Sequence, residues 1–380
     1  MTTTNRTRVL TLSIAHFFND WYMNFIPTLI PFLIASYGFS ISRGSFLVSA
    51  FTITSSIMQP VFGYLVDMKN KRWLVYVGTA WMGFILALIG IIPNYFVMAA
   101  AAVLAGLGTA AFHPQASAMV SAVSGERKGF WQSLFIAFGN AGWAFTPLLV
   151  VPYVHYFGLA KTPALALPGL IAAALLFFLA PQVKNTAPAT PQNLRLLLGP
   201  VAAPLGFTVL AVTLRMLTYF GLITFLPLYL QEKNISLLTS SRLLFIMLLS
   251  GALGGVIGGY LSDIWDRRVI TAGSLLLATP FFYLFLQTTG IPSLIFLVFA
   301  GAALLASFSV TVVAAQETLG GNAAFAAGLT LGFGVGVGGL GVSIAGVLAE
   351  HFGLAWSIHF LILVPLVAGL AALGMPGKRT

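Results

Sequence analysis

The chain alternates long apolar runs with short polar connections. A membrane-spanning α-helix needs about 20 predominantly apolar residues, and twelve runs in this sequence reach that length. The predicted helices cover residues 9–35, 44–66, 73–92, 95–121, 129–151, 163–181, 203–230, 240–262, 267–288, 292–318, 325–349 and 352–374. The pattern therefore predicts an all-α membrane protein with twelve transmembrane helices.

One connection is longer and more polar than the others. Residues 182–202 include Lys184, Asn185 and Arg195 among threonines, alanines and prolines. This stretch divides the predicted helices into two sets of six. We expect an N-terminal half at residues 1–181, a central loop at 182–202 and a C-terminal half at 203–380.

A ten-residue segment occurs once in each half. Residues 63–72 read GYLVDMKNKR and residues 259–268 read GYLSDIWDRR, so Gly, Tyr, Leu, Asp and a closing basic pair recur at one constant offset. The same offset aligns Pro31 with Pro227. A repeat of this extent indicates an internal duplication, with one copy in each half.

The composition excludes a soluble globular protein. Hydrophobic residues make up 59% of the 380 residues and charged residues only 7%, whereas soluble proteins average about 25% charged residues. The chain has no cysteine, which excludes disulfides, thiolate metal ligands and cysteine nucleophiles. The net charge of +10 comes from basic residues in short loops and not from one face or tail, so we expect no nucleic-acid partner.

The basic residues of the loops also predict the orientation, because cytoplasmic loops carry the excess of Lys and Arg. With both termini inside, thirteen basic residues fall in inner segments and four in outer loops, namely Arg43, Lys161, Lys233 and Arg242. The N-terminal run contains Asp20 and lacks a small-residue cleavage site, so we interpret it as a retained first helix. We predict a multi-pass protein with both termini in the cytoplasm.

Ionisable residues within the predicted helices are the first candidates for function, because each costs about 2.5–3.5 kcal/mol at the centre of a spanning helix. They are His16, Asp20, His113, Arg215 and, nearer a helix end, Glu317. On the first helix His16, Asp20 and Asn24 follow at intervals of four and share one face. Asn19 lies beside them, and the prolines at 27 and 31 can loosen the helix beyond.

Arg215 lies near the middle of the seventh predicted helix, and the repeat offset aligns it with Asn19. In two-half transporters the first and seventh helices line a central cavity, so we expect Asp20 and Arg215 to face each other. Two interpretations remain open: a role in transport, or a fixed ion pair that only joins the halves.

Several further polar side chains are candidates for the substrate or proton pathway. They are Gln115, Gln132, Asn140, Tyr219 and Gln316. His113 precedes Pro114, which removes a backbone donor and exposes carbonyls near the imidazole, although a lone histidine is as readily a packing residue. The glycines between Gly332 and Gly341 are interpreted as helix-packing positions.

Two six-helix halves, a central inner loop and the repeated G-Y-L-x-D-x-x-x-[KR]-R segment resemble the major facilitator superfamily over nearly the whole chain. The resemblance implies the major facilitator fold. It also implies that the repeated segments, at the cytoplasmic ends of helices 2 and 8, form a conformational latch made of Gly63, Asp67, Arg72, Gly259, Asp263, Arg267 and Arg268. The alternative is that these loops are only turns and topology signals.

A second set of motifs, spread over six helices, resembles the fosmidomycin resistance proteins. The motifs are His16-x-x-Asn19-Asp20, Gln59-Pro60-Val61-x-Gly63-Tyr64-x-x-Asp67, Phe112-His113-Pro114, Gln132-Ser133-x-Phe135, Gly139-Asn140-x-Gly142 with Pro147, Ala315-Gln316-Glu317 and the glycine run from Gly332 to Gly341. The resemblance implies a proton-coupled drug efflux protein of the bacterial inner membrane. Gln115 stands where the family commonly has an acid, and Arg215 with Tyr219 replaces a Lys-x-x-x-Tyr cluster.

We therefore predict a secondary transporter that exports a small polar or anionic molecule or drug by alternating access. Asp20 is the expected proton-titrating group, and Arg215, with His16 and His113, is suited to binding an anion. The alternative is an uptake symporter or facilitator, because an anion that displaced Asp20 from Arg215 would favour proton binding at Asp20. We expect a monomer with protons, a small-molecule substrate and lipid as partners, and no cofactor or metal site.

An enzyme or a receptor is not expected. No His-Glu-x-x-His motif or comparable pair of catalytic side chains occurs at helical spacing in the apolar runs. The terminal segments are also too short for a soluble output domain. These observations favour transport over catalysis or signalling.

Overall fold

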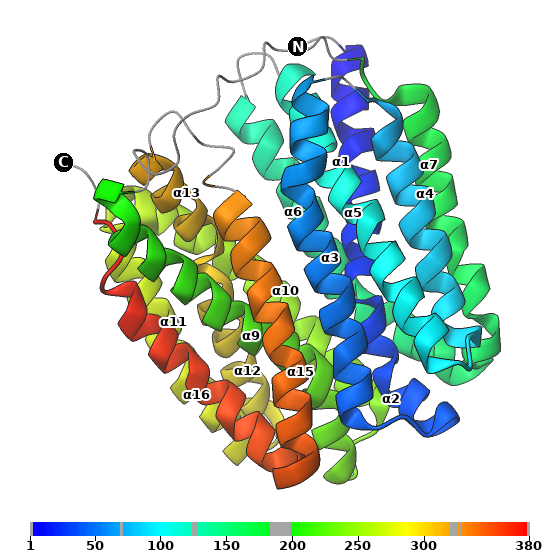
Figure 1. The fold of residues 1–380 in the computed structure, drawn as a ribbon. Coiled ribbons are helices and arrows are strands. Elements are labelled where there is room, and N and C mark those ends of the chain that lie inside the picture. Colours follow the sequence, from blue (N-terminus) through cyan, green and yellow to red (C-terminus); the bar gives the residue numbers. More distant parts are fainter. Residues whose placement is uncertain are drawn as a thin grey trace. The chain divides into compact units, whose positions relative to one another are not determined.

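The computed structural model in Figure 1 describes residues 3–68, 71–123, 128–182, 199–319, 326 and 328–377. The regular structure of these described residues is entirely helical. The chain forms two compact units, Met1–Phe39 with Phe46–Ala189, and Ser40–Ser45 with Thr190–Thr380. Most of the predicted central loop falls on residues 183–198, which lie outside the described part of the chain.

The first unit contains the helices of the first six predicted runs. They are α1 (Thr3–Met23), α2 (Phe25–Tyr37), α3 (Ile41–Met68), α4 (Trp73–Leu88) with η1 (Ile89–Ile91), α5 (Tyr95–Val123), α6 (Lys128–Phe157), η2 (Leu159–Ala166) and α7 (Leu167–Leu179). The helices α1 and α2 together fill one predicted run. The start of α3 lies in the segment Ser40–Ser45, which belongs to the second unit.

The second unit contains the helices of the remaining six runs. They are η3 (Gly199–Val201), α9 (Ala202–Glu232), α10 (Leu237–Ile264), α11 (Arg267–Gln287), α12 (Gly290–Ala306), α13 (Phe308–Leu319), η4 (Gly328–Gly334), α15 (Val335–Phe352) and α16 (Leu354–Ala372). One predicted run is divided at Ser307 into α12 and α13. The glycine-rich start of another run forms the π-helix η4.

Ten helical segments of the described chain are long and apolar enough to cross a membrane. The two predicted runs outside this set are the one shared by α1 and α2 and the one that forms α3. The first is shortened by its division and carries His16 and Asp20, and the second contains many serines and threonines.

The division between α1 and α2 has a local cause. Pro27 has no N–H and cannot donate to the carbonyl of Met23, four residues earlier. The helix stops at Asn24, and hydrogen bonding resumes where Thr28 N donates to Asn24 O at 3.2 Å. The Asn24 side chain holds the break in place by donating from Nδ2 to the carbonyl oxygen of Trp143 on α6, at 3.1 Å.

A glycine brings α1 and α6 together backbone to backbone. A Cβ atom at Gly142 would collide with the carbonyl oxygen of Phe17 and lie 2.9 Å from Trp21 N. Only glycine leaves room for this approach. The position of α1, which carries His16 and Asp20, is therefore set by main-chain contact with α6.

The second unit repeats this contact between α9 and α15. A Cβ atom at Gly338 would lie 2.8 Å from Thr213 O and 3.0 Å from Leu217 N. Each of these three residues lies 196 positions after its counterpart in the first unit. The equivalent helix pair thus makes close backbone contact at a glycine in both copies of the duplication.

Apolar side chains complete the packing within each unit. In the first unit one buried cluster draws on five helices and consists of Val9, Leu12, Ala15, Val75, Phe112, Ala116, Met119, Val120, Phe135, Ala172, Leu176 and Ala180. In the second unit a smaller cluster joins Ala211, Ala272, Ala314, Ala372 and Met375. The first cluster lies beside His16, whose ring stacks on that of Phe135 with ring centroids 4.0 Å apart.

Candidate functional site

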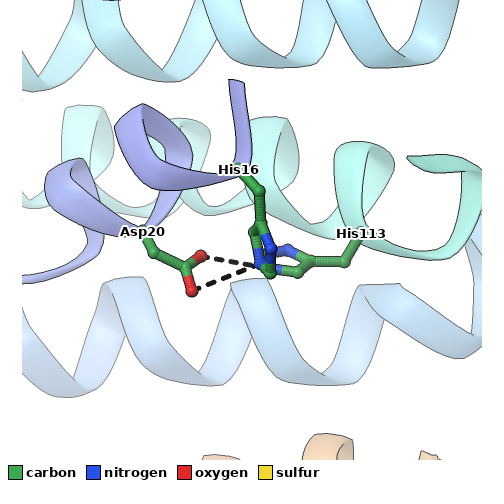
Figure 2. A group of neighbouring side chains, drawn as sticks. All are labelled: His16, Asp20 and His113. Atoms are coloured by element: carbon green, nitrogen blue, oxygen red, sulfur yellow. Dashed lines mark hydrogen bonds and ion pairs between the residues drawn. The ribbon is translucent and has the colours of Figure 1, made fainter. Parts of the chain in front are cut away.

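Three of the predicted site residues meet inside the first unit (Figure 2). His16 and Asp20 project from successive turns of α1, and His113 reaches them from α5. His16 Nε2 lies 3.3 Å from Asp20 Oδ2, and His113 Nε2 lies 3.0 Å from Asp20 Oδ1. The two Nε2 atoms are themselves 3.2 Å apart. His16 and Asp20 are buried, with only 6% of the Asp20 side chain exposed, and His113 is half-buried.

The His16 ring is fixed by α6. Its Nδ1 donates to the carbonyl oxygen of Phe135 at 2.7 Å, and its face stacks on the Phe135 ring. Gly139 makes the approach of α6 possible, because a Cβ atom there would lie 2.5 Å from His16 Cε1 and 2.6 Å from Asp20 Oδ2. The glycine of the Gly139-x-x-Gly142 motif is therefore part of the wall of the cluster.

The His113 ring is fixed by its own helix. Its Nδ1 lies 3.0 Å from the carbonyl oxygen of Thr109 and 3.0 Å from Thr109 Oγ1. The Thr109 hydroxyl donates to Asn19 Oδ1 at 2.7 Å, which connects Asn19 to the cluster. Thr109 was not among the sequence candidates, and it joins the polar face of α1 to His113.

These contacts determine where protons can lie. A carbonyl oxygen only accepts hydrogen bonds, so both histidines carry a proton on Nδ1. Both Nε2 atoms then face each other and Asp20. A contact of 3.2 Å between two nitrogen lone pairs is repulsive, and it becomes attractive when one Nε2 carries a proton. With one Nε2 protonated, the cluster holds one imidazolium, one neutral imidazole and one carboxylate, and its net charge is zero.

The same three side chains offer the kinds of atom that bind metal ions. One atom from each, His16, Asp20 and His113, lies within 4.8 Å of the others, and zinc sites use imidazole nitrogens with carboxylate oxygens. The direct contacts of 3.0–3.3 Å are also hydrogen-bond distances. The same geometry therefore suits either a shared proton or a metal ion.

Arg215 lies in the second unit, on α9, and is 1% exposed. Its Nη1 donates to Ser307 Oγ at 3.0 Å and more weakly to Thr311 Oγ1 at 3.4 Å. The guanidinium carbon lies 5.0 Å from the centroid of the Phe308 ring. These partners surround the point where α12 ends and α13 begins. The expected pairing of Asp20 with Arg215 would cross from one unit to the other and stays a prediction.

The remaining pathway candidates have varied surroundings. Gln115 and Tyr219 are buried, and Asn140 and Gln316 are half-buried. The side chain of Gln132 lies outside the described part of the structure. Within the first unit the structure therefore brings together His16, Asn19, Asp20 and His113 from the predicted set.

Glu317 lies with residues of the predicted latch. It forms an ion pair with Arg267, which connects α13 to the start of α11. The Glu317 side chain is 46% exposed, whereas that of Arg267 is buried. Next to this pair, Asp266 caps α11 by accepting from Arg268 N at 2.8 Å. The second copy of the repeated segment thus ends in a charged junction between two helices.

The other latch residues are only partly described. In the first copy, Arg72 Nη2 donates to the carbonyl oxygen of Phe177 on α7 at 2.6 Å. The surroundings of Gly63 and of the Asp67 side chain lie outside the described part of the structure. In the second copy, Asp263 is exposed, and a Cβ atom at Gly259 would lie 3.0 Å from Ser309 Oγ. The latch role of these residues stays a prediction.

Comparison with known families decides the class of the protein. The family model described as Major Facilitator Superfamily matches residues 12–333. The chain belongs to the major facilitator superfamily. It is a multi-pass membrane transport protein and not an enzyme, and the predicted all-helical major facilitator fold is confirmed.

Two relatives within the superfamily resemble the chain along almost its whole length. The fosmidomycin resistance protein of Escherichia coli (strain K12) is 28% identical over 385 residues, which cover 97% of this chain and 92% of the relative. The uncharacterized MFS-type transporter YfnC of Bacillus subtilis (strain 168) is also 28% identical, with coverage of 98% and 93%. The resemblance to the fosmidomycin resistance proteins that the motifs indicated is confirmed.

Solved structures of other major facilitator proteins share the fold. A bacterial homologue of the human lysosomal transporter Spinster gives a TM-score of 0.82 at 14% identity, covering 98% of this chain and 97% of that one. The nucleoside transporter NupG gives a TM-score of 0.78 at 13% identity, with coverage of 96% and 98%. At these identities the likeness concerns the architecture alone.

Some polar residues that contact the candidate site residues of this major facilitator protein were not predicted from its sequence. Ser307 and Thr311 contact Arg215, and Thr109 contacts His113. A readable signal existed for each, because Ser307 and Thr311 are spaced by four residues within an apolar run, and Thr109 precedes His113 by four. Hydroxyl groups are common in spanning helices, so they signal a site less clearly than ionisable residues do.

Proposed function

We propose that the chain is a proton-coupled exporter of a small polar or anionic molecule such as fosmidomycin. It works by alternating access in the bacterial inner membrane, with both termini in the cytoplasm. The relative from Escherichia coli supports the substrate class through its name. The observation that carries the proton coupling is the buried cluster of His16, Asp20 and His113.

The cluster links proton occupancy to helix packing. With one proton between the imidazoles, attractive contacts join α1 to α5, and His16 joins both to α6 through Phe135. Loss of that proton leaves two nitrogen lone pairs and a carboxylate facing one another in a buried site. This arrangement is repulsive, and His113 on α5 is then released from α1. A change in helix packing that follows one proton is what coupling to transport requires.

We assign the exchangeable proton to the two histidines, with Asp20 as the negative charge that holds it. Imidazole is the side chain whose ordinary titration lies nearest neutral pH. Asp20 lies within hydrogen-bond distance of both Nε2 atoms, so its negative charge is placed to hold a proton on either ring. This assignment shifts the titrating role that the sequence placed on Asp20 alone.

Proton movement in proteoliposomes tests the coupling. Vesicles carry a pH-sensitive dye inside, the membrane potential is clamped, and fosmidomycin is added outside without a pH gradient. Antiport moves protons out as substrate enters, so the lumen becomes alkaline. His113→Gln and Asp20→Asn should abolish this change, while His155→Gln, which alters an exposed histidine of α6, should leave it intact. Full alkalinisation in both His113→Gln and Asp20→Asn would remove the cluster from the mechanism.

Uptake by symport is the second candidate, and Arg215 is the observation that favours it. An anion bound at Arg215 adds negative charge to the loaded transporter, and a proton carried with it would offset that charge, so that both travel together. In the vesicle experiment, symport acidifies the lumen. In cells, export raises tolerance to fosmidomycin when the chain is expressed, whereas uptake lowers it.

A further inference from the structure

Arg215 is a buried cation that the described residues do not neutralise. No carboxylate in the described part of the second unit lies within ion-pair distance of its guanidinium. Both of its hydrogen bonds come from Nη1 and end on neutral hydroxyls, and Nε has no partner. A fully buried charge without a counter-charge is strongly destabilising. An unused N–H edge on such a charge points to a ligand.

A helix break lies beside Arg215. Ser307 interrupts the span, and α13 begins at Phe308 next to the guanidinium. The first turn of α13 carries partial positive charge, whereas the last turn of α12, which ends at Ala306, carries the opposite partial charge at the same point. The two helix ends offset each other, so the guanidinium itself is the positive charge that an anion would neutralise.

The neighbouring groups leave one edge of the guanidinium free. The Thr311 hydroxyl donates to Ser307 O and Phe308 O, both at 3.0 Å, so it faces Arg215 only as an acceptor. The Phe308 ring lies against the guanidinium at 5.0 Å. Nε and Nη2 point in the same direction and form the fork that binds two oxygens of an oxyanion. Ser307 Oγ accepts from Nη1 and keeps its own hydrogen for donation.

We propose that Arg215 and Ser307 form the subsite for the anionic group of the transported molecule, a phosphonate, phosphate or carboxylate. Two oxygens bind the Nε–Nη2 edge, and the Ser307 hydroxyl donates to one of them. All residues of the subsite belong to the second unit, whereas the proton cluster belongs to the first. Its biological use rests on the proposed transport function, but anion binding needs no proton gradient and is measured separately.

Thermal unfolding of the purified full-length chain tests this subsite. The protein is kept in a maltoside detergent, which contains no phosphate, and methylphosphonate is titrated at constant ionic strength. We expect a saturable rise in the unfolding temperature of the wild type. Arg215→Met should lose this rise completely, and Ser307→Ala should weaken binding by about 10-fold or more, because hydrogen bonds to charged groups are strong. Arg242→Met, at an exposed arginine of α10, should bind like the wild type.

The protein without ligand gives a second, independent readout. If Arg215 is an uncompensated charge, Arg215→Met without methylphosphonate should unfold at the same or a higher temperature than the wild type. A lower unfolding temperature together with no saturable effect of methylphosphonate on the wild type would make Arg215 a structural residue and overturn the proposal. Stabilisation by phosphatidylglycerol and not by methylphosphonate would assign the site to a lipid headgroup and overturn it as well.

The two proposals fail separately. Loss of proton movement in vesicles with intact methylphosphonate binding in detergent would refute coupling and leave the anion subsite in place. Intact coupling with no dependence of methylphosphonate binding on Arg215 would refute the subsite and leave the transporter assignment in place.

Discussion

A single methyl group at Gly139 should open the histidine cluster. In Gly139→Ala the new Cβ atom would lie 2.5 Å from His16 Cε1 and 2.6 Å from Asp20 Oδ2, closer than van der Waals contact allows. His16 cannot turn away freely, because its Nδ1 is bonded to Phe135 O. Loss of that bond costs about 0.5–1.5 kcal/mol, and loss of the contact with charged Asp20 about 1.5–3 kcal/mol. Alanine returns about 1 kcal/mol through its helix propensity.

The net prediction is a destabilisation of about 1–3.5 kcal/mol together with loss of coupled proton movement. Thermal unfolding followed by tryptophan fluorescence measures the first effect, and the dye-loaded vesicles measure the second. Gly273→Ala on α11 is the matched control, because a Cβ atom there meets nothing within 4 Å. It should unfold at the wild-type temperature or above. If Gly139→Ala behaved like this control in both assays, the close packing of α6 on the cluster would be refuted.

Substitutions at three further contacts give additional predictions. Tyr22→Phe should destabilise the first unit by about 1–3 kcal/mol in thermal unfolding, because the buried N–H of Gly169 donates to the Tyr22 hydroxyl at 3.0 Å and would lose its acceptor. Arg267→Glu or Glu317→Arg alone should slow transport, and the double exchange should restore it, although the half-exposed pair contributes at most about 1 kcal/mol to stability; no rescue would argue against a latch. Thr109→Val should reduce proton movement less than His113→Gln, since the backbone carbonyl of residue 109 still accepts from His113 Nδ1. An equal loss would show that the Thr109 hydroxyl matters more than this carbonyl for the position of His113.

The spanning helices were the most predictable part of the molecule. A lipid environment forces the backbone into helices and the apolar residues into long runs, so the runs alone locate them. The division at Asn24 was also readable, because Pro27 cannot complete the hydrogen bond to the residue four before it. The division at Ser307 was not predictable, because no proline lies near it in the sequence. It is seen only in the structure, where Ser307 contacts Arg215.

The candidate site was predictable only as far as it is local. His16 and Asp20 share a face because they lie one turn apart on the same helix. The arrival of His113 depends on how α5 packs against α1, and a packing arrangement of this kind does not follow from the period of either helix. The same reason explains why Thr109 was missed. Its importance comes from one hydrogen bond to Asn19 on another helix.

The paired glycine contacts have a consequence for how such a protein diverges after duplication. Gly142 and Gly338 hold their partner helices by main-chain atoms, which no substitution on the partner helix can remove. Polar side chains nearby are therefore free to change while the separation of the helices stays constant. One ancestral scaffold can in this way acquire Asp20 with two histidines in one copy and Arg215 with two hydroxyl groups in the other. Neither helix pair has to change its packing.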